Sequence, residues 1–169
     1  MTISLFQVSV PTYVRQLNSL SAIIQKAIGY CAERKIDPSA LLQARLYPNM
    51  FPLTHQVRFA CNHAERGVCR LMGMEPPTRE NNEKTLEELV TRIATAIAFV
   101  KSAEAKKMEG MEDRDITFPV GEKQITLKGV DYLFQFSMPN FYFHVTTAYS
   151  ILRHNGLQMG KQDFLGDQQ

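Results

Sequence analysis

The sequence predicts one all-α domain, a four-helix bundle with a short β-hairpin inserted before the last helix. Two observations lead to this fold class. Apolar residues recur at steps of three and four in four long stretches, whereas between the third and the fourth stretch they alternate for a short distance. The composition does not change along the chain, and 44% hydrophobic and 21% charged residues in 169 positions are typical of one globular domain. We therefore expect a single domain over residues 1–169.

The first long helix is expected to carry its apolar stripe from Val10 to Cys31. Ser9 before Pro11 is typical of a helix start, with an earlier turn as the alternative. The helix is expected to end at residues 33–35, because Arg34 and Lys35 suit the negative end of a helix dipole. A short helical connector should follow it, with Asp37 as N-cap and a proline at its first position.

The second and third long helices are separated by a proline-rich loop. The second is expected to run from about Pro52 to Met72, and Pro76-Pro77 prevents the helix from continuing. The third is expected to begin at Thr85, because Glu88 stands three residues later in the spacing of a capping box. It should end near Ser102, where a polar stretch begins.

The alternating stretch predicts a hairpin of two short strands, residues 116–120 and 125–127, joined at Gly121-Glu122. Pro119 marks the first strand as an edge, and we expect the pair to lie against the helices. The fourth helical region is expected to begin near Val130. Pro139 either kinks it or starts a new helix, and Asn155-Gly156 should end it with a left-handed cap.

Composition argues against several functions. A net charge of +2, with basic residues scattered among acidic ones, does not predict nucleic-acid binding. No apolar run approaches the ~20 residues that a bilayer crossing needs, so no membrane span is expected. The three cysteines form no C-x-x-C and are expected to be free thiols of a cytoplasmic protein; the sequence leaves the reactivity of Cys61 and Cys69 open.

The four histidines form no metal motif. His55 and His63 stand eight residues apart, about 80° from a common helix face at ~100° per residue, and His144 and His154 diverge similarly. A helical metal site commonly uses ligands three or four residues apart, so we expect no intact metal site and no cofactor. The chain also has no glycine-rich phosphate loop and no G-x-S-x-G nucleophile motif.

The richest stretch is Pro139–Gly156, with four aromatic residues and two histidines. Two interpretations stay open. In the structural one, the apolar residues of this helix form a core face and its histidines make ordinary hydrogen bonds. In the functional one, Asn140 and His144, with Thr147 or Tyr149, line an interhelical pocket for a small-molecule ligand.

Three segments resemble a bacterial domain-of-unknown-function family that is allied to the DinB/YfiT-like superfamily of metalloenzymes: Met50–Arg58, Pro139–Gly156 and Lys161–Gly166. The resemblance implies a DinB-like four-helix bundle with a long crossover between the first two long helices, and a homodimer. Better-understood relatives bind a divalent metal with three histidines. One histidine comes from the second helix and two from an H-x-x-x-H on a later helix, and some of these proteins transfer low-molecular-weight thiols.

This chain departs from that pattern, since Asn140 and Ala148 stand four residues before and after His144. A nickel, zinc or iron ion would have only His55, His63 and His144 as candidate ligands. Our leading hypothesis is a small-ligand-binding protein without an intact metal site. The alternatives are a divalent-metal-dependent enzyme such as a thiol S-transferase, and a protein-interaction module.

Overall fold

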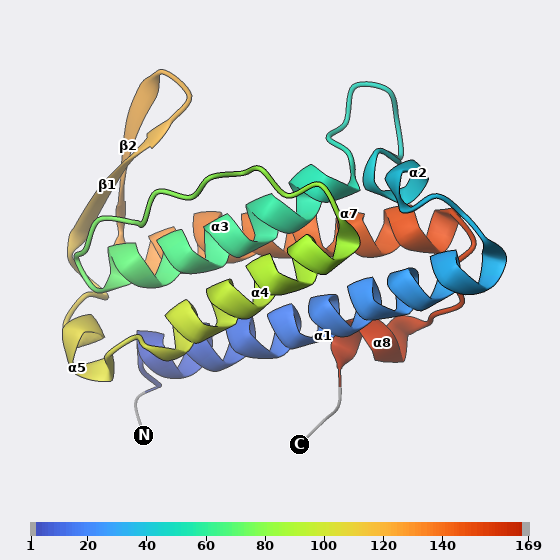
Figure 1. Ribbon diagram of the computed structural model, residues 1–169. Coiled ribbons are helices and arrows are strands. Elements are labelled where there is room, and N and C mark those ends of the chain that lie inside the picture. The colour runs from blue at the N-terminus through green and yellow to red at the C-terminus, as the bar shows by residue number, and fades with distance from the viewer. Residues whose placement is uncertain (1–2, 167–169) are drawn as a thin grey trace.

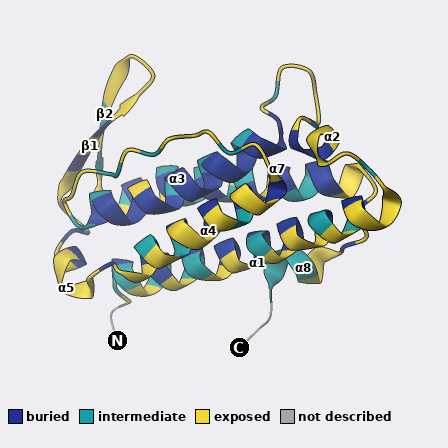
Figure 2. Cartoon of the chain, viewed as in Figure 1, coloured by how far each residue is buried: buried dark blue, intermediate teal, exposed yellow. Residues whose placement is uncertain are grey.

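The computed structural model describes residues 3–166 and confirms the all-α bundle with its hairpin. Figure 1 shows four long helices lying side by side: α1 (Leu5–Arg34), α3 (Leu53–Leu71), α4 (Leu86–Lys101) and α7 (Met138–His154). Helix α1 packs chiefly against α4, and α3 packs against both α4 and α7. Helix α3 therefore has neighbours on two sides, and most of its residues are buried (Figure 2).

Helices α3 and α4 are parallel neighbours. Arg58 in the first turns of α3 bonds Glu83 just before α4, and Met72 after α3 accepts a hydrogen bond from the Glu104 amide after α4. The chain must therefore return along the whole bundle between them, which it does as an extended segment, residues 72–85 (Figure 1). The resemblance implied a long crossover between the first two long helices. That placement was wrong, because the long crossover joins the second long helix to the third. The first two long helices are antiparallel, so the connection between them, which contains the short α2 (Pro38–Leu42), stays at one end of the bundle.

The predicted start of the first helix at Ser9 was wrong, because α1 begins at Leu5. Ser4 and Gln7 form a reciprocal capping box that satisfies the first backbone amides. Pro11 consequently lies inside the helix, where it removes one backbone donor. The predicted end is confirmed, with Lys35 in the left-handed conformation at φ 53°.

The capping box of Thr85 and Glu88 is confirmed at the start of α4. A short helix that the sequence did not predict, α5 (Ala105–Met108), precedes the hairpin. The hairpin pairs β1 (Asp115–Val120) with β2 (Lys123–Lys128) in antiparallel register. Its base is anchored by buried Ile116 and Phe118, whereas its tip stands away from the helices (Figure 2).

Pro139 lies in the first turn of α7, and the backbone stays helical from the preceding π-helical turn into α7. The chain passes from α6 (Gly129–Asp131) through a wide π-helical turn, η1 (Tyr132–Ser137), into α7, whose first turn contains Pro139. The Met138 amide still bonds the Leu133 carbonyl, so the missing donor of Pro139 falls where the π-helical pairing gives way to α-helical pairing. The end of α7 near Gly156, at φ 93°, is confirmed, and the last described element, α8 (Lys161–Leu165), docks on α1.

The side chain of Arg15 donates a hydrogen bond to the Leu165 carbonyl, and that of Gln16 to the Phe164 carbonyl, which fixes the docking of α8. Within residues 3–166, none of the helices combines the length and the apolar character that a membrane crossing requires.

Gly67 allows η1 to approach α3 closely. A Cβ atom at this position would lie 2.7 Å from the Ser137 hydroxyl and 2.8 Å from the Tyr13 hydroxyl. These two hydroxyls are buried and share a hydrogen bond of 2.8 Å. The absent side chain of Gly67 therefore makes room for a polar contact between α1 and η1.

We expect Gly67→Ala to lower the free energy of unfolding by about 1–3 kcal/mol, because the added methyl group overpacks this contact. Gly29→Ala is the matched control, since Gly29 also lies inside a long helix but has open space around its Cβ position. It should raise stability by up to about 1 kcal/mol through helix propensity. Urea unfolding of both variants measures the difference, and equal effects would contradict the packing role of Gly67.

Candidate functional site

Helices α3 and α7 bring two histidines together. The rings of His63 and His144 lie with their centroids 5.4 Å apart and their planes 18° from parallel. Both side chains are only partly exposed. Both residues are candidate ligands in the sequence, and the structure places them as a pair at the α3–α7 contact.

Gln56 fixes the proton on His144. Its side-chain nitrogen donates to the Phe51 carbonyl at 2.9 Å, so its oxygen faces the Nδ1 atom of His144, 2.8 Å away. An amide oxygen only accepts hydrogen bonds, and therefore Nδ1 must carry the proton. The Nε2 atom of His144 is left with a free lone pair, able to accept a hydrogen bond or to bind a metal ion.

Burial keeps both imidazoles neutral. It lowers the pKa of His63 from 6.5 to about 3, with further lowering by His144, Arg66 and Arg70. It also lowers the pKa of His144 from 6.5 to about 4. At neutral pH the pair therefore carries no charge, and it presents acceptors to a ligand.

His55 lies outside this pair. Its ring stacks on Phe51 at 5.5 Å and contacts Phe59, whose ring in turn contacts His144 at 5.1 Å. Along α3, eight residues separate it from His63, a rise of about 12 Å. Burial lowers the pKa of His55 as well, and its Nδ1 atom is buried without a hydrogen-bond partner among the described residues.

The three other pocket candidates make contacts away from the imidazole pair. The Asn140 side chain donates to the Phe136 carbonyl, and the Thr147 hydroxyl donates to the Phe143 carbonyl, each at 2.7 Å. Tyr149 packs its ring against Phe164 of α8 at 5.8 Å. Asn140 and Thr147 thus bond the carbonyl one turn earlier on the helix, and Tyr149 helps to dock α8.

The metal that the resemblance implies does not fit this set of donors. Residues 3–166 contain no group of three histidine, cysteine, aspartate or glutamate side chains placed to hold an ion. Beside the two imidazoles stands the carboxamide of Gln56, which is a poor ligand for zinc or nickel and is already bonded to Nδ1. Ala148 occupies the position of the second histidine of an H-x-x-x-H.

Two features of this region were not predicted from the sequence. Gln56 could not be recognised from the sequence, because a glutamine next to a histidine is common in surface helices. The second feature is a buried ionic network around Glu65 of α3 and Arg92 of α4. Each of these charges stands beside the apolar stripe of its helix, and that placement is the signal that could have revealed them.

The fold is that of a helical-bundle protein of the DinB-like class. The chain belongs to the family described as domain of unknown function DUF1993, whose model matches residues 5–165. It is similar to the crystal structure of a DinB family member protein from Shewanella denitrificans, with 36% identity and a TM-score of 0.91. The match covers 97% of this chain and 93% of the other. No protein with a curated function matches this chain.

We expect Gln56→Glu to raise the pKa of His144 from about 4 toward or above its ordinary value of 6.5. The new carboxylate would face the Nδ1 proton and stabilise the charged imidazole. In the unchanged protein, stability should fall as pH drops from 6.5 toward 4, because the unfolded chain takes up protons that the folded chain does not. In Gln56→Glu this loss should shrink.

NMR titration of the imidazole protons measures both pKa values, and urea unfolding across the same pH range measures stability. Gln124→Glu, an exposed change on β2, is the matched control and should leave His144 unaltered. An unchanged pKa in Gln56→Glu would contradict the assigned hydrogen bond.

Proposed function

We propose that this protein binds a small organic ligand at His144, and that the ligand donates a hydrogen bond to its Nε2 atom. The observation that carries the proposal is the chain of contacts from the Phe51 carbonyl through Gln56 to Nδ1. This chain of contacts holds the Nε2 lone pair of His144 in a fixed direction before a ligand binds. Such preorganisation reduces the cost of binding.

The surroundings of the imidazole pair favour a flat, mostly apolar ligand. The rings of Phe59 and Phe143 flank His144 at 5.1 and 5.2 Å, and Phe136 lies 6.3 Å from His63. Aromatic side chains bind other rings by offset or edge-on contact. The expected ligand therefore combines an O–H, N–H or S–H donor with an aromatic or otherwise flat body.

The low pKa of His144 favours binding over proton transfer. An imidazole with a pKa of about 4 is a weak base at neutral pH, whereas general bases work best when their pKa lies near the working pH. Its lone pair still accepts a hydrogen bond. We therefore propose a binding role for this imidazole.

A divalent-metal-dependent enzyme, such as a thiol S-transferase, is the second candidate. It is favoured by the closeness of two neutral imidazoles, since neutral imidazole is the form that binds nickel, zinc or iron. Against it stands the donor set, with Gln56 and Ala148 where further ligands would be needed. In the first candidate His144 binds the ligand directly, and in the second it binds the ion.

Phenol is a suitable probe, because it joins an O–H donor to one aromatic ring. We expect His144→Ala to weaken phenol binding by about tenfold, the effect of one lost hydrogen bond together with ring contact. His154→Ala is the matched control, since His154 lies exposed in the last turn of the same helix. Chemical-shift titration measures both affinities, and equal phenol binding by the two variants would refute the proposal.

Metal analysis of protein purified without a histidine tag separates the two candidates. We expect nickel, zinc and iron at well below one equivalent per chain, because only two imidazoles converge. Near-stoichiometric metal that is lost in His144→Ala would favour the enzyme.

We further propose that the protein is a cytoplasmic homodimer. Cys31, Cys61 and Cys69 are buried free thiols, as is usual in a reducing compartment. Phe143 beside His144 is 55% exposed, and Phe51 beside His55 is 54% exposed. They offer apolar surface for self-association, or for a partner if the protein is an interaction module. Light scattering should give twice the chain mass of 19.3 kDa; a monomer would favour the module.

A further inference from the structure

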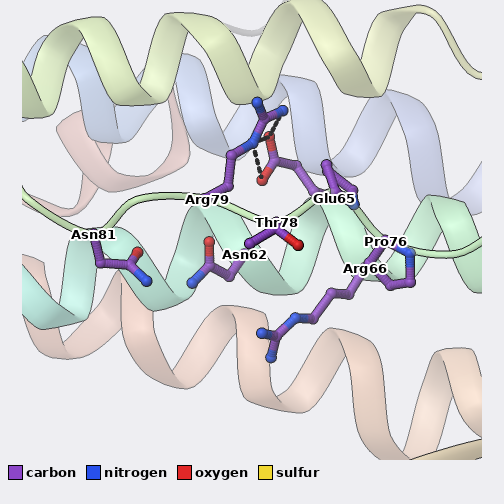
Figure 3. Close-up of a pocket in the computed structure, with 8 residues that line it drawn as sticks. Asn62, Glu65, Arg66, Pro76, Thr78, Arg79 and Asn81 are labelled. Carbon is purple, nitrogen blue, oxygen red and sulfur yellow. Dashed lines mark hydrogen bonds and ion pairs between the residues drawn. The ribbon is translucent and has the colours of Figure 1, made fainter.

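A cavity of about 220 Å³ lies between α3 and the crossover segment 72–85. Asn62 and Arg66 of α3 line it from one side, and Thr78, Arg79 and Asn81 of the crossover line it from the other (Figure 3). Its wall is rich in hydrogen-bond donors. It shares no lining residue with the imidazole pair.

The one carboxylate in this wall, that of Glu65, is fully engaged. Arg79 donates to both of its oxygens, at 2.8 to 3.4 Å, and Arg92 donates to both from the α4 side, at 2.6 and 3.2 Å. Arg92 also lies 3.9 Å from an oxygen of Glu83, so the buried charges of this network are paired with one another. Figure 3 shows the Arg79 guanidinium turned toward Glu65 and α4, on the side away from Arg66.

Asn62 presents a donor to the cavity. Its Oδ1 atom accepts a hydrogen bond of 2.8 Å from Arg92, and because a guanidinium only donates, this contact fixes the orientation of the amide. The Nδ2 atom is turned the other way in Figure 3 and has no hydrogen-bond partner among residues 3–166. The residue is only 7% exposed and lines the cavity, so this nitrogen can donate to a ligand that enters there.

Arg66 adds a further positive charge. It stands one turn after Asn62 on α3, and Figure 3 shows its guanidinium directed away from Glu65, toward the α7 ribbon. No described residue forms an ion pair with it. Since Glu65 is the only acid in the wall and is already paired with Arg79 and Arg92, the charge of Arg66 is left without a counter-charge in the cavity wall.

We propose that this cavity binds a small oxyanion, the carboxylate or phosphate group of a metabolite, between the guanidinium group of Arg66 and the side-chain nitrogen of Asn62. Arginine suits such groups because its planar N–H fork matches two oxygens at once. The cavity is below the ~300 Å³ of typical ligand pockets, which favours a compact anion over a nucleotide. The ligand would join the crossover to α3 and hold it there.

Inorganic phosphate and succinate are the probes, and they distinguish the two chemical sources of the oxyanion. Isothermal titration should show saturable millimolar or tighter binding of at least one of them, with chloride at matched ionic strength as reference. Arg66→Gln should weaken that binding by about tenfold, as expected for one charge-assisted hydrogen bond. Asn62→Asp should abolish it, because an acceptor replaces the donor while Arg92 keeps its partner.

Arg34→Gln is the matched control, since it removes the same charge from an exposed residue at the end of α1. Amide hydrogen exchange should slow in residues 78–81 when the anion binds. The proposal is overturned if neither probe binds better than chloride, or if Arg34→Gln and Arg66→Gln weaken binding equally. Phenol binding at His144 is measured separately, so failure at one site leaves the other distinguishable.

Discussion

The ion pairs of Glu65 with Arg92 and Arg79 are the interaction on which the rest of the structure depends. Glu65 is 1% exposed at the centre of the most buried helix, so its charge needs partners. Arg92 provides one from α4 and Arg79 provides another from the crossover. Removing one partner of such a buried pair typically costs about 3–5 kcal/mol, whereas the intact pair adds little net stability. The network therefore determines which segments pack on α3, and it adds little to the net stability of the fold.

That selection matters because α3 and α4 are parallel. Parallel neighbours bring two helix N-termini, both partly positive, to the same end of the bundle. Glu83 lies there between Arg58 and Arg92, and Glu87 and Glu88 occupy the first turn of α4. These acids offset the two helix dipoles. The crossover that the parallel arrangement requires is held by the same side chains, so its path and the packing of α4 are fixed together.

The sequence allowed the elements to be predicted better than the site. Periodicity and capping signals are local, so the ends of α3, the Thr85 capping box and the hairpin were all predictable. Ser4 was missed because Ser9 and Pro11 offered a stronger nearby signal. The pairing of His63 with His144 depends on how two helices rotate against each other, which periodicity alone does not determine. The roles of Gln56 and Asn62 depend on which atom of the side-chain amide, oxygen or nitrogen, faces a given partner. No sequence pattern encodes that orientation.

Both candidate sites depend on α3. Asn62 and His63 are consecutive, so a helix turn of about 100° directs one toward the crossover and the other toward α7. In each site an amide has its orientation set by a neighbour: Gln56 by the Phe51 carbonyl, and Asn62 by Arg92. Ala148 stands where the resemblance implies a third histidine, so no ligand set at this place fixes the imidazole of His144. The Gln56 oxygen fixes it instead, because it accepts the Nδ1 proton, and burial keeps the ring neutral.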